Sequence, residues 1–223
     1  MPAPPNGEFV ARREDILDVY QRPYDPHFPQ VCLDELSTQL LADTRPPQPP
    51  APEHLAREDY EYERHGTANI FLCYEPLRGW RSVTVTERRT RQDWAQVIKA
   101  LVDVHYPAAE RIVLVQDNLN THTIGSLYEA FPAAEARRLA EKLELHYTPK
   151  HASWLDMAEI ELSVLRRQCL DRRIPDLPTL TTEVAAWETA RNAQDSIVNW
   201  RFTTADAPYQ TQTSLPNSLV ADY

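Results

Sequence analysis

Three acidic residues of this chain occupy positions that suit metal-dependent chemistry. Asp34 follows the apolar run QVCL, Asp117 follows the β-branched run RIVLVQ, and Glu159 lies at the start of an expected helix. A carboxylate at the end of a buried strand lies at the carboxyl edge of the sheet, where α/β folds place their sites. Three carboxylates that converge there repel one another unless cations lie between them. Hard oxygen ligands favour Mg²⁺ or Mn²⁺ over zinc, and two such ions can promote cleavage of a phosphodiester.

Each acid also has a simpler structural interpretation. An aspartate at a strand end often only forms a turn, and Glu159 lies three residues after the good N-cap residue Asp156, as in a capping box. Two acidic neighbours also compete for the role. By strand alternation Glu35 faces away from Asp34, and Glu161 lies about 200° around the helix from Glu159. The spacing therefore selects the three acids named first over these neighbours.

Polar residues beside the second and third acids are candidates for supporting roles or contacts with DNA. The loop after the second acid contains Asn118 and His122. His122 either donates to a phosphate, orients a metal-bound water, or caps the helix that follows. Lys150 and His151 precede the third acid and could contact DNA phosphates.

The elements that must position these residues follow from hydrophobic periodicity. Strands are expected at 30–34, 68–74, 81–86, 111–116 and 144–147, and helices at 8–20, 90–105, 124–130, 133–142, 157–170 and 181–194. The continuous apolar run at 111–116 is typical of a strand that is covered on both faces. This order predicts an α/β fold with a mixed sheet flanked by helices. The proline-rich stretch 45–52 predicts an exposed, stiff connector.

Composition limits the class of protein. The 223 residues are 42% hydrophobic and 25% charged, which is typical of a folded globular domain. The three cysteines are widely spaced, so we expect neither a disulfide framework nor a zinc site, and we expect a reducing cytoplasm. No apolar run reaches the ~20 residues that span a bilayer, so no membrane partner is expected.

The overall charge does not exclude a nucleic-acid partner. The net charge is −10, but residues 66–175 contain 15 Lys and Arg against 14 Asp and Glu. Basic residues gather there in three short clusters: Arg88, Arg89 and Arg91; Arg137 and Arg138; Arg166, Arg167, Arg172 and Arg173. Bulk charge therefore does not drive binding to DNA, although local basic turns can contribute to it.

Three stretches carry a resemblance to a known family: VCLDE (31–35), VLVQDNLNTH (113–122) and HYTPKHASWLDMAEIELSVLRRQCL (146–170). They resemble the catalytic blocks of insertion-sequence transposases of the mariner superfamily, in the IS six-thirty branch. The resemblance implies a ribonuclease-H-like (retroviral-integrase-like) fold and a DDE triad of Asp34, Asp117 and Glu159. It also implies two Mg²⁺ (or Mn²⁺) ions, DNA at the transposon ends and target as substrate, and a homo-oligomer in a nucleoid-associated transposition complex.

The sequence departs from the family pattern in three places. The interval between Asp117 and Glu159 contains 41 residues, more than the mid-thirties common in the superfamily, and Asp156 stands where an asparagine is more usual. Only a short segment precedes Asp34, so no helix-turn-helix domain is expected. We therefore expect an N-terminal segment at 1–26, a catalytic domain at 27–200 and a tail at 201–223. A truncated, catalytically silent remnant that acts through dimerisation is the alternative.

Overall fold

The computed structural model describes residues 7–45, 60–150, 152–198 and 200–206, and its centre is one five-stranded sheet. The strands follow the spatial order β3-β2-β1-β4-β5. β1 pairs antiparallel with β2 and parallel with β4, so the sheet is mixed, as expected from the sequence. The strand bounds are β1 Gln30–Asp43, β2 Tyr62–Glu75, β3 Trp80–Thr86, β4 Ile112–Gln116 and β5 Leu143–Tyr147.

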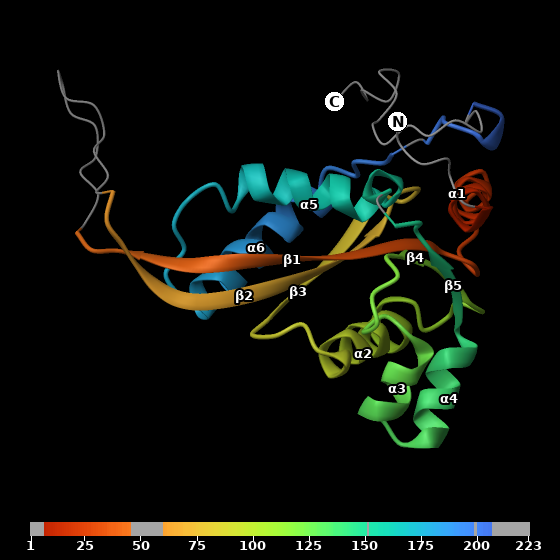
Figure 1. Ribbon diagram of the computed structural model, residues 1–223, viewed down its shortest axis with the longest axis horizontal. Coiled ribbons are helices and arrows are strands. Elements are labelled where there is room, and N and C mark those ends of the chain that lie inside the picture. The colour runs from red at the N-terminus through yellow and green to blue at the C-terminus, as the bar shows by residue number, and fades with distance from the viewer. Residues whose placement is uncertain (1–6, 46–59, 151, 199, 207–223) are drawn as a thin grey trace.

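Helices cover both faces of the sheet (Figure 1). One face packs against α1 (Gly7–Tyr20), α5 (Met157–Gln168) and α6 (Leu177–Asn192). The other face packs against α2 (Arg91–Ala100), α3 (Ile124–Ala130) and α4 (Ala133–Glu141). Three short helical turns lie at Leu101–His105, Ser153–Leu155 and Thr204–Asp206. Because both faces are covered, every residue of β4 is buried, as its continuous apolar run predicts.

Side-chain alternation along β1 assigns neighbouring residues to opposite layers. Cys32 belongs to the hydrophobic core beneath α5, whereas Val31 and Leu33 belong to the core beneath α2. Continuing this period of two places Asp34 on the α5 side of the sheet and Glu35 on the α2 side. The two consecutive acids are thus directed towards different helices.

β1, β2 and α6 begin or end several residues from their expected bounds, and β2 begins at Tyr62 rather than at 68. β1 continues nine residues beyond Asp34, because β2 pairs with it from Cys32↔Tyr74 to Asp43↔Tyr62 and so extends the ladder past the end of β4. α6 begins at Leu177 rather than near 181, because Asp176 caps it and Pro178 lies in its first turn, where proline is tolerated. Most of the proline-rich stretch 45–52 lies outside the described residues.

In the described part of the chain, no helix is both long enough and apolar enough to cross a bilayer.

Candidate active site

The first two acids lie at matching positions on adjacent parallel strands. The last paired residues of β1 and β4 are Leu33 and Gln116, and Asp34 and Asp117 follow them directly. Adjacent strands lie about 4.8 Å apart, so this register brings the two residues to one edge of the β1–β4 pair. The sequence predicted that Asp34 would be the last residue of its strand, and this prediction was wrong. Asp34 lies within β1, opposite Leu72. The carboxyl edge here is therefore the end of β4, and β1 runs past it.

Glu159 reaches the same region from the first turn of α5, which packs across β1 and β2. The segment that leads into α5 is fixed to α1, because the hydroxyl of Tyr20 donates to the carbonyl oxygen of Leu155 at 2.6 Å. The Asp156 side chain then accepts a hydrogen bond from the Ala158 N–H at 2.9 Å and caps the helix. In the described part of the chain, no bond from the Glu159 carboxylate completes a capping box. That carboxylate therefore remains available for another role.

The electrostatics of Asp34 connect the three acids. Burial raises the pKa of the Asp34 carboxyl to about 7, although the Glu35 N–H donates to it at 2.8 Å and opposes the shift. The nearby negative charges of Glu35, Asp117 and Glu159 raise this pKa further. Asp34 therefore experiences the fields of both other acids that the sequence selected, as expected of carboxylates that share one site.

Asp156 adds a fourth carboxyl group to this region. Burial raises its pKa well above the ordinary value, and the charges of Asp34, Asp117 and Glu159 raise it as well. Its Oδ1 caps α5, whereas its Oδ2 is buried and has no hydrogen-bond partner within the described structure. The cap expected from the sequence is thus present, and the acid that forms it also lies in the field of the other three. We call Asp34, Asp117, Asp156 and Glu159 the acid cluster.

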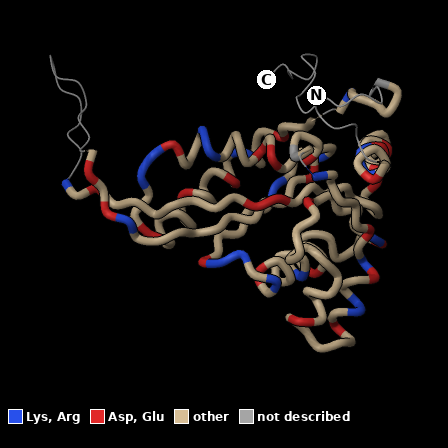
Figure 2. Tube along the Cα trace, viewed as in Figure 1, with Lys and Arg blue, Asp and Glu red and all other residues tan. Residues whose placement is uncertain are grey.

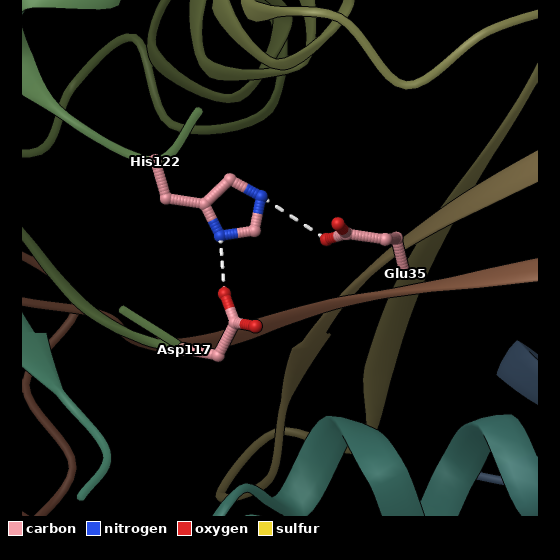
Figure 3. Close-up of side chains that lie close together, drawn as sticks. All are labelled: Glu35, Asp117 and His122. Carbon is pink, nitrogen blue, oxygen red and sulfur yellow. Dashed lines mark ion pairs between the residues drawn. The ribbon is translucent and has the colours of Figure 1, made fainter. Parts of the chain in front are cut away.

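A second group of side chains meets the acid cluster at Asp117 (Figure 3). The His122 ring lies between two carboxylates, with Nδ1 2.6 Å from Asp117 Oδ1 and Nε2 3.0 Å from Glu35 Oε2. Burial alone would lower the pKa of this imidazole. The contacts with the two carboxylates and their charges outweigh burial and raise the pKa of His122 to about 9. Among the described residues, Glu35, Asp117 and His122 form the one group of three or more His, Cys, Asp or Glu whose ligand atoms all lie within 4.8 Å of one another, so Asp34, Asp117 and Glu159 do not come together at that distance.

The position of His122 does not match two of the three roles considered for it, the contact with a DNA phosphate and the helix cap. The side chain is fully buried and both ring nitrogens face carboxylates, so it does not reach a DNA phosphate in this conformation. It does not cap α3 either, because the N-cap position is Thr123, which makes no side-chain cap bond. Glu35 faces away from Asp34, as alternation predicts, yet it lies next to the site through His122. Sequence reasoning missed this contact, because no local spacing relates a residue of β1 to the loop after β4.

Two of the remaining candidate residues, Asn118 and Lys150, lie in loops at the same edge. Asn118 is exposed in the loop after β4, and Lys150 is exposed in the loop after β5, whose Thr148 N–H bonds to the Gln116 carbonyl oxygen at 2.9 Å. His151 lies outside the described residues. The structure thus places Asn118 and Lys150 at the same edge as the first two acids.

The basic turn between β3 and α2 lies beside the second group of side chains. Figure 2 shows it as a blue stretch between these elements. Arg89 is 56% exposed, and its guanidinium lies 3.7 Å from Glu35 Oε1. Charges therefore alternate from Asp117 through His122 and Glu35 to an arginine at the surface. The arginine cluster noted in the sequence is thus connected to the site.

The family follows from comparison with known proteins. Residues 29–181 match the model of the DDE superfamily endonucleases, so the chain belongs to this family. No protein of curated function matches the chain in sequence.

Among solved structures, the chain is similar to the Mos1 mariner transposase. The catalytic domain of Mos1 aligns with a TM-score of 0.55 at 12% identity, over 88% of this chain and 90% of that one. The Mos1 paired-end complex with the left transposon end aligns with a TM-score of 0.54 at 14% identity, and the complex with Mn at 0.54 and 15%. These two alignments cover 87% and 88% of this chain, which spans 60% of the length of the Mos1 chain. The ribonuclease-H-like, mixed α/β fold expected from the sequence is confirmed.

Proposed function

We propose that this chain is the catalytic domain of a transposase of the IS six-thirty branch of the mariner superfamily. It cleaves DNA at transposon ends and joins the 3′-hydroxyl to target DNA. The observation that supports the proposal is the acid cluster, in which the charges of the neighbouring acids raise the pKa of both Asp34 and Asp156. No Lys or Arg among the described residues forms an ion pair with Asp34, Asp156 or Glu159. Asp156 is buried and the other two are half-buried, and carboxylates so placed without basic partners fit a site that binds cations.

The ligand types of the acid cluster fit Mg²⁺ or Mn²⁺. Asp34, Asp117 and Glu159 would hold the metal, because carboxylate oxygens are the ligands these ions prefer. Bound in pairs, such ions stabilise the attacking and leaving oxygens of a phosphodiester in an in-line displacement. Asp34 has a pKa raised to about 7, so it gives up its proton when it becomes a ligand. Metal affinity should therefore rise with pH up to that value.

The position of the site suggests how DNA binds. Asn118, Lys150 and the turn at Arg89 are exposed near the carboxyl edge, where they can contact phosphates without reading bases. We expect weak, salt-sensitive and sequence-indifferent binding by this chain alone, in the non-specific range of ~10⁻⁴–10⁻⁶ M. Assembly on two transposon ends as a homo-oligomer is part of the proposal, which the paired-end complexes of Mos1 support.

A nicking assay tests the proposed function. Purified protein is incubated with supercoiled plasmid, with and without Mn²⁺ or Mg²⁺, and nicked product is measured over time. We expect slow metal-dependent nicking that is abolished by Asp34→Asn, Asp117→Asn and Glu159→Gln. Glu8→Gln is the matched control, because this exposed glutamate forms its ion pair with Arg12 within α1, outside the basic clusters. Nicking that survives in all three variants would refute the proposed triad. A folded, metal-binding protein without any activity would favour the silent remnant.

A further inference from the structure

The loop between β4 and α3 folds back, so that His122 lies beside the end of β4. The backbone carbonyl oxygen of His122 accepts bonds from Gln116 Nε2 at 3.1 Å and from the Tyr147 hydroxyl at 3.0 Å. Its N–H donates to the Leu119 carbonyl oxygen at 3.0 Å. None of these contacts uses the imidazole, so the backbone holds residue 122 in place whatever its side chain is.

The imidazole itself is packed and polarised on all sides. The ring is fully buried, and its plane stacks at 25° against Trp94 with 6.0 Å between the ring centroids. The indole N–H of Trp94 donates to Gln116 Oε1 at 3.1 Å, so the stacking partner is fixed as well. The ring can therefore contact Asp117 and Glu35 in only one orientation.

Binding of a metal by His122 explains this arrangement poorly. Asp117 lies at Nδ1 and Glu35 lies at Nε2, on opposite sides of the ring (Figure 3). A metal ion binds one imidazole nitrogen only, so a single ion could not replace both contacts without displacing one carboxylate. The two nitrogens instead each lie in ion-pair contact with a carboxylate oxygen, at 2.6 Å and 3.0 Å, although neither contact is a well-formed hydrogen bond, and this arrangement suits an imidazole held between two carboxylates. Such a histidine can orient a carboxylate that acts elsewhere.

We propose that His122 is a positioning residue for Asp117, with Glu35 as the group that orients the imidazole. Nδ1 holds Oδ1 of Asp117, while the second oxygen of that carboxylate points away from the ring (Figure 3). Glu35 is then a partner of the histidine and not a metal ligand. This inference rests on the proposed function, because it assigns Asp117 to the metal site.

Two amide replacements of His122 distinguish a role in positioning Asp117 from a role in packing alone. In His122→Asn the amide nitrogen can take the place of Nδ1 and reach Asp117, whereas in His122→Gln it can take the place of Nε2 and reach Glu35. Both variants lose the ring, so both should lose similar thermal stability. The readout is the Mg²⁺ concentration that gives half of the maximal rise in melting temperature, measured without DNA. It reports metal binding rather than turnover.

We expect the half-point of His122→Asn to stay within about threefold of the wild type, and that of His122→Gln to rise about tenfold or more. Equal half-points in the two variants would overturn the inference while leaving the proposed function intact. Absence of any Mg²⁺ or Mn²⁺ effect on the wild type would overturn both. Asp117→Asn provides the reference for complete loss of the ligand.

Variants of Glu35 give an independent test if both histidine variants fail to fold. Glu35→Gln keeps an oxygen that can accept from Nε2–H, so the Mg²⁺ half-point should stay close to the wild-type value. Glu35→Ala removes the partner that orients the ring, so the half-point should rise several-fold. Rescue by the conservative variant is the result expected for a positioning pair. A loss in Glu35→Gln as large as that in Asp117→Asn would identify Glu35 as a metal ligand and overturn the inference.

Discussion

Two groups of charges meet α5 two residues apart, at Glu159 and Glu161, and are built in opposite ways. The acid cluster includes Glu159 and has no arginine or lysine ion pair at Asp34, Asp156 or Glu159 among the described residues. Glu161, by contrast, is 2% exposed and accepts from Arg81 Nε at 2.6 Å and from Arg191 Nε at 2.7 Å. One helix thus carries a compensated carboxylate on one side and an uncompensated one on the other.

The compensated group joins three elements of the fold. Arg81 is fully buried, donates to the carbonyl oxygens of Gly79 and Ser196, and lies over the ring of Tyr74 with 4.7 Å to the centroid. It belongs to β3, while Arg191 belongs to α6. Because each charge has a partner, this group can hold α5 against β3 and α6 without any ligand.

This difference distinguishes a carboxylate of α5 that is paired within the fold from one that is available for function. Burying a charge costs several kcal/mol unless a partner of opposite charge offsets it. The fold provides that offset at Glu161 and withholds it at the acid cluster, where a raised carboxyl pKa records the cost. The first group is therefore compensated within the protein itself, whereas under the proposed function bound cations would compensate the second.

The largest expected effect breaks the compensated group. Glu161→Ala leaves Arg81 and Arg191 without their carboxylate in a buried environment. We expect the free energy of unfolding to fall by about 3–5 kcal/mol, which is the usual cost of an unpaired buried charge. Urea denaturation followed by circular dichroism measures it. Glu161→Gln keeps one acceptor and should lose less, and an unchanged midpoint in Glu161→Ala would contradict a stabilising role.

A second prediction concerns the acid cluster, where we expect a substitution to raise the stability of the protein rather than lower it. The pKa of Asp34 is about 7 in the folded state, above that of an unfolded aspartate. Between about pH 4 and 7 the unfolded state therefore loses its proton first, so stability falls as pH rises through this range. Without metal, Asp34→Asn should remove this decline and stabilise the protein by on the order of 2–4 kcal/mol at pH 8. Melting curves across pH in EDTA measure it, and a less stable variant at pH 8 would contradict it.

A third prediction separates the two roles of Asp156. Its Oδ1 caps α5, whereas burial and the charges of the neighbouring acids raise its pKa. Asp156→Asn keeps an oxygen that can cap the helix and removes the carboxyl group that this environment disfavours in its charged form, so we expect no loss of melting temperature at pH 7. Asp156→Ala should cost about 0.5–2 kcal/mol, because the Ala158 N–H loses its partner. Similar losses in both variants would show that the carboxyl does more than cap the helix.

The smallest effect is expected at the surface. Glu129 pairs with Arg91, and both side chains are largely exposed. Glu129→Ala should change the free energy of unfolding by less than about 1 kcal/mol, as exposed ion pairs usually do. The same urea titration then serves as a control for Glu161→Ala. If Glu129→Ala lowered the free energy of unfolding as much as Glu161→Ala, burial could not explain why Glu161 matters more for stability than Glu129.

Much of the fold could be predicted from local pattern. The apolar run before Asp117 forms β4 within a residue of its expected bounds, and α3 has the bounds expected for it. Their hydrophobic periodicity is set by burial, which is visible in the sequence itself. The length of β1 could not be predicted, because its second half is partly polar and is a strand only through pairing with β2.

The candidate site divides in the same way. Sequence by itself determined which acids follow buried strands or begin a helix, and it separated Glu159 from Glu161 by helical angle, because these relations extend over a few residues. The tertiary structure alone decided that His122 is buried between Glu35 and Asp117, that Asp156 lies in the field of the triad, and that two arginines meet Glu161. These contacts join side chains from different strands, loops and helices, and only the packing of those elements sets their charges side by side.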